Sequence, residues 1–225
     1  MPGRPVSART RLKRHPERGA FDRATIDAIL DEALVCHVGF VEDGTPVVVP
    51  TVHARVGDVV YLHGSPASRM LTTLAGGCEL CLTVTLVDGL VLARSAFDHS
   101  VNYRSVMAFG KARLVTDAAE KLAALEAVTE HMVPGRWAEL RPPNGRELDA
   151  TIVLAVPLDE ASAKVRSGPP ADDSAREGTD VWAGVVPLVL DAGRPEPAAG
   201  VPAGLAPPAY LGALTRPVQE DGERS

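Results

Sequence analysis

Residues 34–64 read LVCHVGFVEDGTPVVVPTVHARVGDVVYLHG, and this stretch decides the fold. It contains three apolar, β-branched runs separated by two short glycine-containing turns, with the runs at 34–41, 47–56 and 59–64 and the turns at 42–45 and 57–58. Strands joined by turns this short are antiparallel neighbours, because a parallel crossover needs about a dozen residues or more. The stretch therefore predicts an antiparallel sheet.

The same pattern continues beyond this stretch. Asp88-Gly89 between two apolar runs predicts a hairpin. Further strands are predicted at 103–115, 151–156, 162–166 and 182–190. Helices with Asp or Ser caps are predicted at 22–33, 65–74 and 117–131. Short antiparallel strands in this number close most economically into a barrel, because closure removes sheet edges. The predicted fold is mainly β with inserted helices, an antiparallel barrel of six to eight strands.

Both ends of the chain differ in composition from the middle. Residues 1–19 are rich in arginine and predict a basic arm, residues 20–190 the folded domain, and residues 191–225 a Pro/Ala-rich tail. The first 20 residues hold no apolar run, so no signal peptide is expected. No uninterrupted apolar run reaches the roughly 18 residues of a spanning helix. We therefore expect no membrane partner.

Composition excludes several classes of protein. The 225 residues are 45% hydrophobic but only 4% aromatic, so the core must consist of Val, Leu, Ala and Ile. Few aromatic side chains and a net charge of −6 argue against a nucleic-acid partner. Three cysteines do not make a disulfide framework. We expect a cytoplasmic protein of a reducing compartment.

Residues 61–69, YLHGSPASR, are the most informative for chemistry. Ser65-Pro66 predicts the start of a helix, whose first turn would offer free N–H groups to an anion. Ser68 and Arg69 add a hydroxyl group and a guanidinium that suit phosphate oxygens. His63 would lie further along the same ligand. A capped surface helix with these side chains in water accounts for the residues equally well.

Other motifs carry less. The polar cluster at 102–107 could supply donors to a planar ligand or could lie exposed at a strand end. Cys78-x-x-Cys81 stands alone, so no metal site is predicted. The GxSxG, Walker A and GxGxxG motifs are absent before any predicted helix, which removes hydrolase and Rossmann interpretations.

Five segments together resemble the pyridoxamine 5′-phosphate oxidase-like flavoproteins, the FMN-binding split barrels. They are most similar to the branch that contains the 5-nitroimidazole-resistance proteins. The segments are LHGSPASR at 62–69, VTLVDGLVLARS at 84–95, NYRSV at 102–106, EASAKVR at 160–166 and VWAGV at 181–185. The resemblance implies a split β-barrel and a homodimer with FMN at the subunit interface.

The resemblance also implies roles for individual residues. The strand of Val49, Pro50, Thr51 and Val52 is expected to run along the flavin. His63 is expected near the flavin or its ribityl chain, and Ser68 and Arg69 at the phosphate, where the predicted helix start adds Ser65. Arg104, Ser105 and Val106 are expected near the isoalloxazine, and Trp182 is expected from the partner subunit. Met70 replaces the lysine that follows Ser-Arg in the oxidases proper, and their C-terminal substrate motif is not recognisable. The expected substrate is therefore not pyridoxamine phosphate.

These expectations lead to an FMN-dependent oxidoreductase acting on a small nitroaromatic, quinone or pyridoxal-type molecule. A nicotinamide cofactor could supply electrons, and a deazaflavin could replace FMN. His63 is the one candidate catalytic side chain, as a proton donor beside the flavin. Two alternatives stay open: a haem-binding split barrel with His63 as axial ligand, and a ligand-binding dimer without catalysis.

Overall fold

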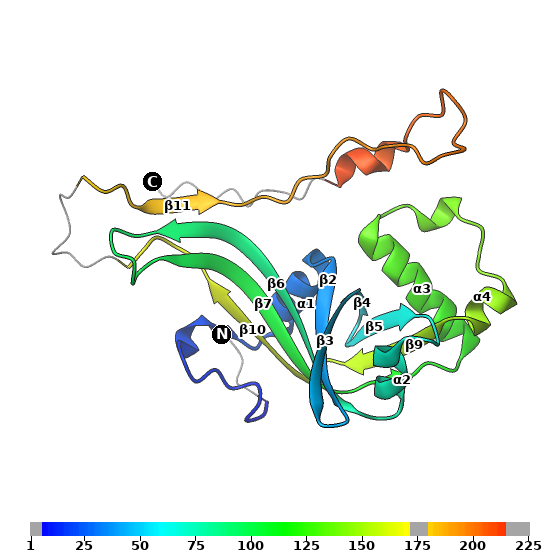
Figure 1. Ribbon diagram of the computed structural model, residues 1–225, viewed down its shortest axis with the longest axis horizontal. Coiled ribbons are helices and arrows are strands. Elements are labelled where there is room, and N and C mark those ends of the chain that lie inside the picture. The colour runs from blue at the N-terminus through cyan, green and yellow to red at the C-terminus, as the bar shows by residue number, and fades with distance from the viewer. Residues whose placement is uncertain (1–5, 172–179, 215–225) are drawn as a thin grey trace.

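The strands of the computed structural model form two antiparallel sheets, as the sequence predicts (Figure 1). The structure describes residues 6–171 and 180–214. The seven-stranded sheet has the order β1-β10-β7-β6-β2-β3 with β11 beside β6, and the four-stranded sheet has the order β4-β5-β9-β8. The two ladders stay separate, so the architecture is a split barrel.

The elements have the following bounds. The strands are β1 Gly19–Ala20, β2 Val35–Glu42, β3 Thr45–Val52, β4 Ala54–Val56, β5 Val59–Gly64, β6 Glu79–Leu92, β7 Ser100–Lys111, β8 Arg113–Leu114, β9 Ile152–Pro157, β10 Glu160–Arg166 and β11 Gly184–Pro187. The helices are α1 Arg23–Glu32, α2 Arg69–Ala75, α3 Ala118–Met132 and α4 Gly145–Asp149, with 3-10 turns η1 Pro16–Arg18, η2 Trp137–Glu139 and η4 Ala209–Ala213.

The predicted turn at 42–45 is confirmed and joins β2 to β3. Asp43 and Gly44 both have left-handed backbone angles, with φ of 47° and 75°. Two such residues make the turn whose twist matches that of the flanking strands, and Asp-Gly is a favoured pair for it. Val35 and Val52 mark the far end of the resulting ladder.

The predicted single strand at 47–56 is wrong, because the chain changes sheets at His53. β3 belongs to the large sheet and β4 to the small one. His53 is fully buried between them, and its Nε2 lies 3.1 Å from the Leu30 carbonyl oxygen of α1. The apolar run predicts extended backbone correctly, but periodicity alone does not reveal a change of partner.

The predicted hairpin at Asp88-Gly89 is also wrong. β6 runs through both residues as one strand, and its register with β7 shifts between Val87 and Gly89, which marks a bulge. The chain reverses later, at 93–99. A Cβ added at Gly89 would lie 3.1 Å from a methyl carbon of Val185 and from the carbonyl oxygen of Val186, so glycine allows β11 to pair closely with β6 here.

The predicted helices at 22–33 and 117–131 are confirmed. The carboxylate of Asp22 accepts from the Thr25 N–H at 2.9 Å, and that of Asp117 accepts from the Glu120 N–H at 2.8 Å. α1 buries Ile26, Ile29 and Leu30. These caps and spacings are local, which is why the sequence suffices to predict them.

The core consists of aliphatic side chains, as the composition predicts. Val, Leu, Ala and Ile dominate it, and Phe40 is the one aromatic residue in the main cluster of buried side chains within the described residues. None of the helices described here is long and apolar enough to cross a membrane.

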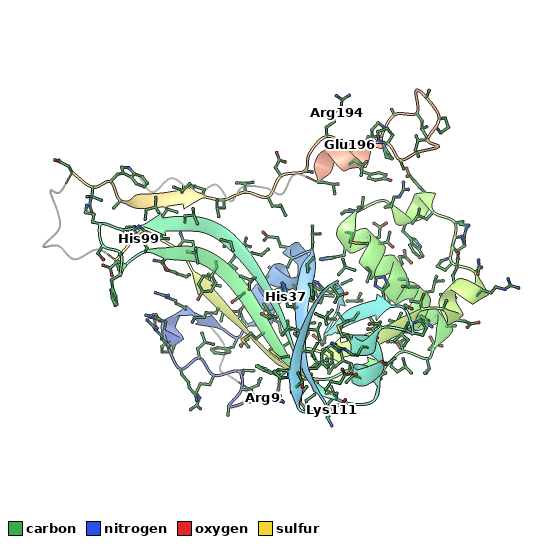
Figure 2. All side chains as sticks on the ribbon, in the orientation of Figure 1. Arg9, His37, His99, Lys111, Arg194 and Glu196 are labelled. Carbon is green, nitrogen blue, oxygen red and sulfur yellow. The ribbon has the colours of Figure 1, made fainter. Side chains whose placement is uncertain are left out.

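The two ends of the described chain pack against the strands. Arg9 donates to Glu79, at the start of β6, and also pairs with Glu160, at the start of β10; Figure 2 places Arg9 at the same end of the sheet as Lys111. The predicted strand at 182–190 is shorter than expected and covers only β11. Beyond it the chain passes through turns at 199–200 and 203–204 to η4, where the Tyr210 hydroxyl donates to Glu139 at 2.7 Å (Figure 1).

Candidate functional site

The predicted phosphate-binding helix begins three residues later than expected. Ser68, not Ser65, caps α2, since its hydroxyl oxygen accepts from the Leu71 N–H at 3.4 Å. Ser65 instead closes the preceding turn, where its carbonyl oxygen accepts from the Ser68 N–H at 2.9 Å and its hydroxyl oxygen from the Ala67 N–H at 3.2 Å. The turn still brings Ser65, Ser68 and Arg69 to one corner of the fold.

Arg69 extends from this corner and is tied to β2. Its Nε lies 3.2 Å from a carboxylate oxygen of Glu42, and the Arg69 side chain remains 65% exposed. Glu42 also accepts from the Thr73 hydroxyl at 2.7 Å, so the carboxylate links β2 to α2. The pair is made through Nε, and the guanidinium has two further nitrogens that suit an anion. The sequence offers no signal for the Glu42 partner.

Gly64 serves packing rather than ligand approach. A Cβ at this position would lie 3.0 Å from the Leu71 side chain of α2. The glycine therefore lets α2 sit directly on the end of β5, which carries His63. Met70 points into the core and is 5% exposed, so this position does not face the corner around Arg69.

His63 is half-buried on β5, opposite Val153 of β9. Its Nδ1 is buried and has no hydrogen-bond partner in the described part of the chain. Burial lowers the pKa of the imidazole, because the charged form loses solvation. His63 is therefore neutral near pH 7, the form in which imidazole coordinates a metal or shares a proton with a ligand.

The strand predicted to run along the flavin lies at a sheet edge. Val49, Pro50, Thr51 and Val52 form the second half of β3, the last strand in the order of the large sheet. One side of β3 pairs with β2, and β3 also lies against β5, the strand of His63. The edge therefore offers unpaired backbone groups near one side of the predicted site.

The segment predicted to approach the isoalloxazine is engaged inside the fold. Arg104 donates to Asp88 from Nε at 3.0 Å and from Nη2 at 2.7 Å, and it pairs with Glu32 through both Nη atoms. Hydrogen bonds to these two carboxylates raise the pKa of Arg104, with Glu32 as the larger cause. The β6 bulge aims Asp88 at this guanidinium. Sequence reasoning missed both carboxylates.

The other predicted contacts fall along the same strands. The Ser105 hydroxyl donates to the Lys164 carbonyl oxygen at 3.3 Å, and the Val106 side chain is fully buried in the core. Trp182 precedes β11 and is 65% exposed, with its ring folded over Gly184. The structure thus brings together Ser65, Ser68 and Arg69, whereas Arg104 and Trp182 lie along the ribbon formed by β6, β7 and β11.

Residues 22–165 match the pyridoxamine 5′-phosphate oxidase family. The chain belongs to this family. The match covers both sheets except β1 and β11, so membership rests on the strands and on the corner around His63 and Arg69 rather than on either end of the chain.

Solved structures of the same fold extend the similarity to most of the chain. The flavocytochrome Anf3 from Azotobacter vinelandii is 41% identical, with a TM-score of 0.86 over 93% of this chain and 97% of that one. The FAD and haem binding protein from Mycobacterium smegmatis is 38% identical, with a TM-score of 0.84 over 88% and 97%. A candidate 5-nitroimidazole antibiotic resistance protein from Bacteroides thetaiotaomicron is 27% identical, with a TM-score of 0.55 over 65% and 86%. No curated protein matches.

Proposed function

We propose that this protein is a flavin-dependent oxidoreductase for a small molecule. The observation that carries the proposal is the similarity, over about nine-tenths of the chain, to a flavocytochrome and to an FAD and haem binding protein. A bound flavin would supply the redox chemistry, so the protein itself has to bind the flavin, orient the substrate and exclude water. FMN and FAD both fit a site that recognises phosphate, and the FAD-binding relative favours FAD.

The corner around α2 is our proposed site for a flavin phosphate. Ser65 and Ser68 carry hydroxyl groups there, and Arg69 keeps two guanidinium nitrogens beyond the one that faces Glu42. Bonds from a charged donor to phosphate are among the stronger hydrogen bonds in proteins. Glu42 already restrains the Arg69 side chain. This restraint limits the side-chain entropy that is lost when the phosphate binds.

Beside this corner, His63 supports a second candidate function, haem binding. A neutral imidazole with an unpartnered, buried Nδ1 can serve as an axial ligand or share a proton with a substrate. The two relatives described as flavocytochrome and as FAD and haem binding protein favour this role. The two functions are compatible in one protein.

Assembly as a homodimer is part of the proposal. Apolar side chains stay exposed along the ribbon of β6, β7 and β11, among them Val87, Leu90, Val101 and Val186. A second copy of the chain would cover such a surface. A nicotinamide cofactor as electron donor and a cytoplasmic location complete the proposal, and a ligand-binding dimer without turnover is its alternative.

Absorption spectroscopy of the purified protein tests both cofactors at once. Oxidised flavin and haem give distinct visible bands, and extraction followed by chromatography separates FMN from FAD. We expect flavin bands in the protein as isolated or after incubation with FAD. A colourless protein that takes up neither FMN, FAD nor haem would overturn the proposal. Turnover with nitroaromatics, quinones and pyridoxal compounds then separates an enzyme from a binding dimer.

The role of Arg69 is tested by comparing ligands that differ in phosphate. Arg69→Ala is expected to weaken FMN binding about ten- to a hundredfold and riboflavin binding little, because a hydrogen bond to a charged group contributes about 1.5–3 kcal/mol. Arg141→Ala is the matched control, since Arg141 is equally exposed and pairs with Glu147 on a distant helix. Equal losses for FMN and riboflavin would refute the assignment.

A further inference from the structure

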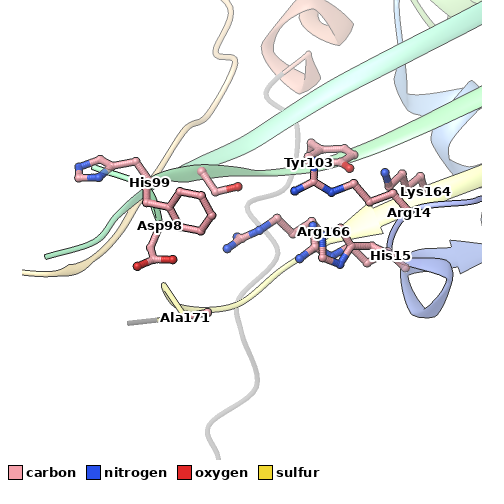
Figure 3. A pocket seen from close by; sticks show the side chains of 11 residues that line it. Arg14, His15, Asp98, His99, Tyr103, Lys164, Arg166 and Ala171 are labelled. Atoms are coloured by element: carbon pink, nitrogen blue, oxygen red, sulfur yellow. The ribbon is translucent and has the colours of Figure 1, made fainter. Parts of the chain in front are cut away.

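A second concave site lies far from α2, beside the end of the β6–β7 ribbon. Its volume is about 500 Å³. Cationic and aromatic side chains from three separate segments line it: Arg14, His15 and Arg18 from the chain before β1, Tyr103 from β7, and Lys164 and Arg166 from β10. Figure 3 shows Arg14, His15, Lys164 and Arg166 gathered around Tyr103. Neither the predicted flavin site nor the proposed function uses these residues.

Positive charge in this site is poorly neutralised. Within residues 6–171 and 180–214, neither Arg14 nor Lys164 forms an ion pair, and the one carboxylate paired with the group is that of the exposed Glu17, which lies 3.0 Å from His15 Nδ1 and 3.8 Å from Arg18 Nε. Several arginines elsewhere do contact a carboxylate closely, namely Arg23, Arg55, Arg104, Arg113, Arg136 and Arg141. In a chain with a net charge of −6, such a cluster is not a consequence of overall composition.

Asp98 is the one acidic residue among the described lining residues. Its carboxylate accepts a hydrogen bond from the Ser95 hydroxyl at 2.5 Å and forms no ion pair with the described cationic residues of the lining. Burial, and to a smaller extent the charge of Arg18, lowers the pKa of Arg166. An anion bound beside this guanidinium would favour its charged form.

The cations are held in place by the sheet. Lys164 and Arg166 are two residues apart on β10, so their side chains emerge on the same face. Arg166 donates from Nη1 to the side-chain oxygen of Asn102, which is buried and donates from Nδ2 to the Gly168 carbonyl oxygen at 3.2 Å. Tyr103 is the cross-strand partner of Arg166. Because Arg166 is held by Asn102 beside this ring, its side chain loses little entropy when a ligand binds.

We propose that this cavity binds the diphosphate of a nucleotide. Four cationic side chains exceed what one monovalent anion needs, and adjacent guanidinium and ammonium groups match the oxygens of two linked phosphates. Tyr103 and the exposed Phe97 offer rings on which a base can stack. The volume lies within the range of small-molecule sites, which is about 300–1,000 Å³.

The nucleotide that fits is separate from the flavin. The two phosphates of FAD are directly linked, and the proposed function already places the flavin phosphate at the corner around α2, far from this cavity. The source of the diphosphate is therefore a free nucleoside diphosphate or a dinucleotide such as a nicotinamide dinucleotide, and FMN and FAD serve as comparison ligands.

The test uses the full-length protein and a pair of charge variants. Lys164→Gln with Arg166→Gln removes two positive charges from the cavity. Arg113→Gln with Arg141→Gln removes two from exposed sites that are paired with Glu120 and Glu147, and serves as the control. Calorimetry measures binding of ADP and of inorganic pyrophosphate, and fluorescence titration measures binding of FMN and FAD. Circular dichroism checks that both variants are folded.

The cavity variant is expected to bind ADP and pyrophosphate at least tenfold more weakly than the wild-type protein does. The control variant is expected to bind them with unchanged affinity. A loss for ADP and pyrophosphate with FMN and FAD unchanged supports a separate nucleotide, whereas a loss for FAD without one for ADP would place the flavin diphosphate in this cavity and overturn the proposal. The proposal is also overturned if the wild-type protein binds neither ADP nor pyrophosphate, or if both variants lose affinity equally. The ADP measurement stands even if the protein takes up no flavin, so the two proposals fail separately.

Discussion

Acidification is expected to destabilise this protein through His53. The imidazole is fully buried where the chain passes from one sheet to the other, and its Nε2 lies 3.1 Å from the Leu30 carbonyl oxygen. The ring of His131, on α3, lies 5.1 Å away, and its own Nε2 is 2.8 Å from the Ala33 carbonyl oxygen. The two histidines together hold the C-terminal end of α1.

The size of the effect follows from the pKa of His53. Burial, and to a smaller extent the nearby His131, lowers this pKa from 6.5 to about 4, while the Leu30 carbonyl and Asp31 act in the opposite direction. The unfolded chain therefore takes up the proton more readily, and stability that is complete above pH 6.5 is lost as the pH falls towards 4. Linkage gives a loss of about 2 kcal/mol at pH 5 and about 3 kcal/mol at pH 4 from this residue alone.

Urea unfolding at pH 7, 5 and 4 measures the effect. His53→Gln keeps an amide donor for the Leu30 carbonyl oxygen but does not titrate, so its free energy of unfolding should fall about 2 kcal/mol less between pH 7 and 5 than that of the wild-type protein. His37→Gln, on the exposed side of β2, is the control and should behave as the wild-type protein does.

A direct titration keeps the reasoning testable if His53→Gln folds poorly. NMR of the wild-type protein should give a midpoint for His53 near 4, the value that burial predicts. A midpoint near 6.5, or equal acid sensitivity of the wild-type protein and His53→Gln, would refute the reasoning.

Three further substitutions test the fold. Leu82→Ala, at a fully buried position, should lower the free energy of unfolding by about 2–5 kcal/mol in urea, and a loss below about 1 kcal/mol would contradict its place in the core. Arg104→Ala leaves Glu32 and Asp88 without their cation and should cost about 1–3 kcal/mol by thermal unfolding, and no loss would mean that the pairs are replaced by water. Asp117→Ala removes the cap of α3 at a cost of about 1 kcal/mol, whereas Asp117→Asn should stay within a few tenths.

Local features of the fold could be predicted from the sequence, and changes of partner could not. The β2–β3 turn and the caps at Asp22 and Asp117 depend on residues within four positions of one another. Asp88-Gly89 is a turn signal as well as a bulge signal, and what distinguishes them is β11, which pairs there from almost a hundred residues away. The chain likewise changes sheets at His53, where the imidazole contacts α1 and α3, and these contacts have no local signal in the sequence.

The same division runs through the candidate site. Ser65, Ser68 and Arg69 lie within five residues, so the pattern predicts that they meet, although the turn displaces the start of the helix. Glu42, the partner of Arg69, and Glu32, a partner of Arg104, come from other elements and carry no local signal. The cationic cavity carries no local signal either, since its residues come from the chain before β1, from β7 and the segment that precedes it, and from β10.

One edge of β6 is shared between two strands that enter from opposite ends of the chain. β2 pairs with its first part, opposite residues 80–83, and β11 with its last part, opposite residues 89–92. A protein shortened before Gly184 would leave the second part with unpaired backbone groups next to apolar side chains. Such an edge accepts strands from other molecules. Protease digestion or truncation within the C-terminal region would therefore convert a folded protein into one that aggregates, without disturbing the α2 corner or the core.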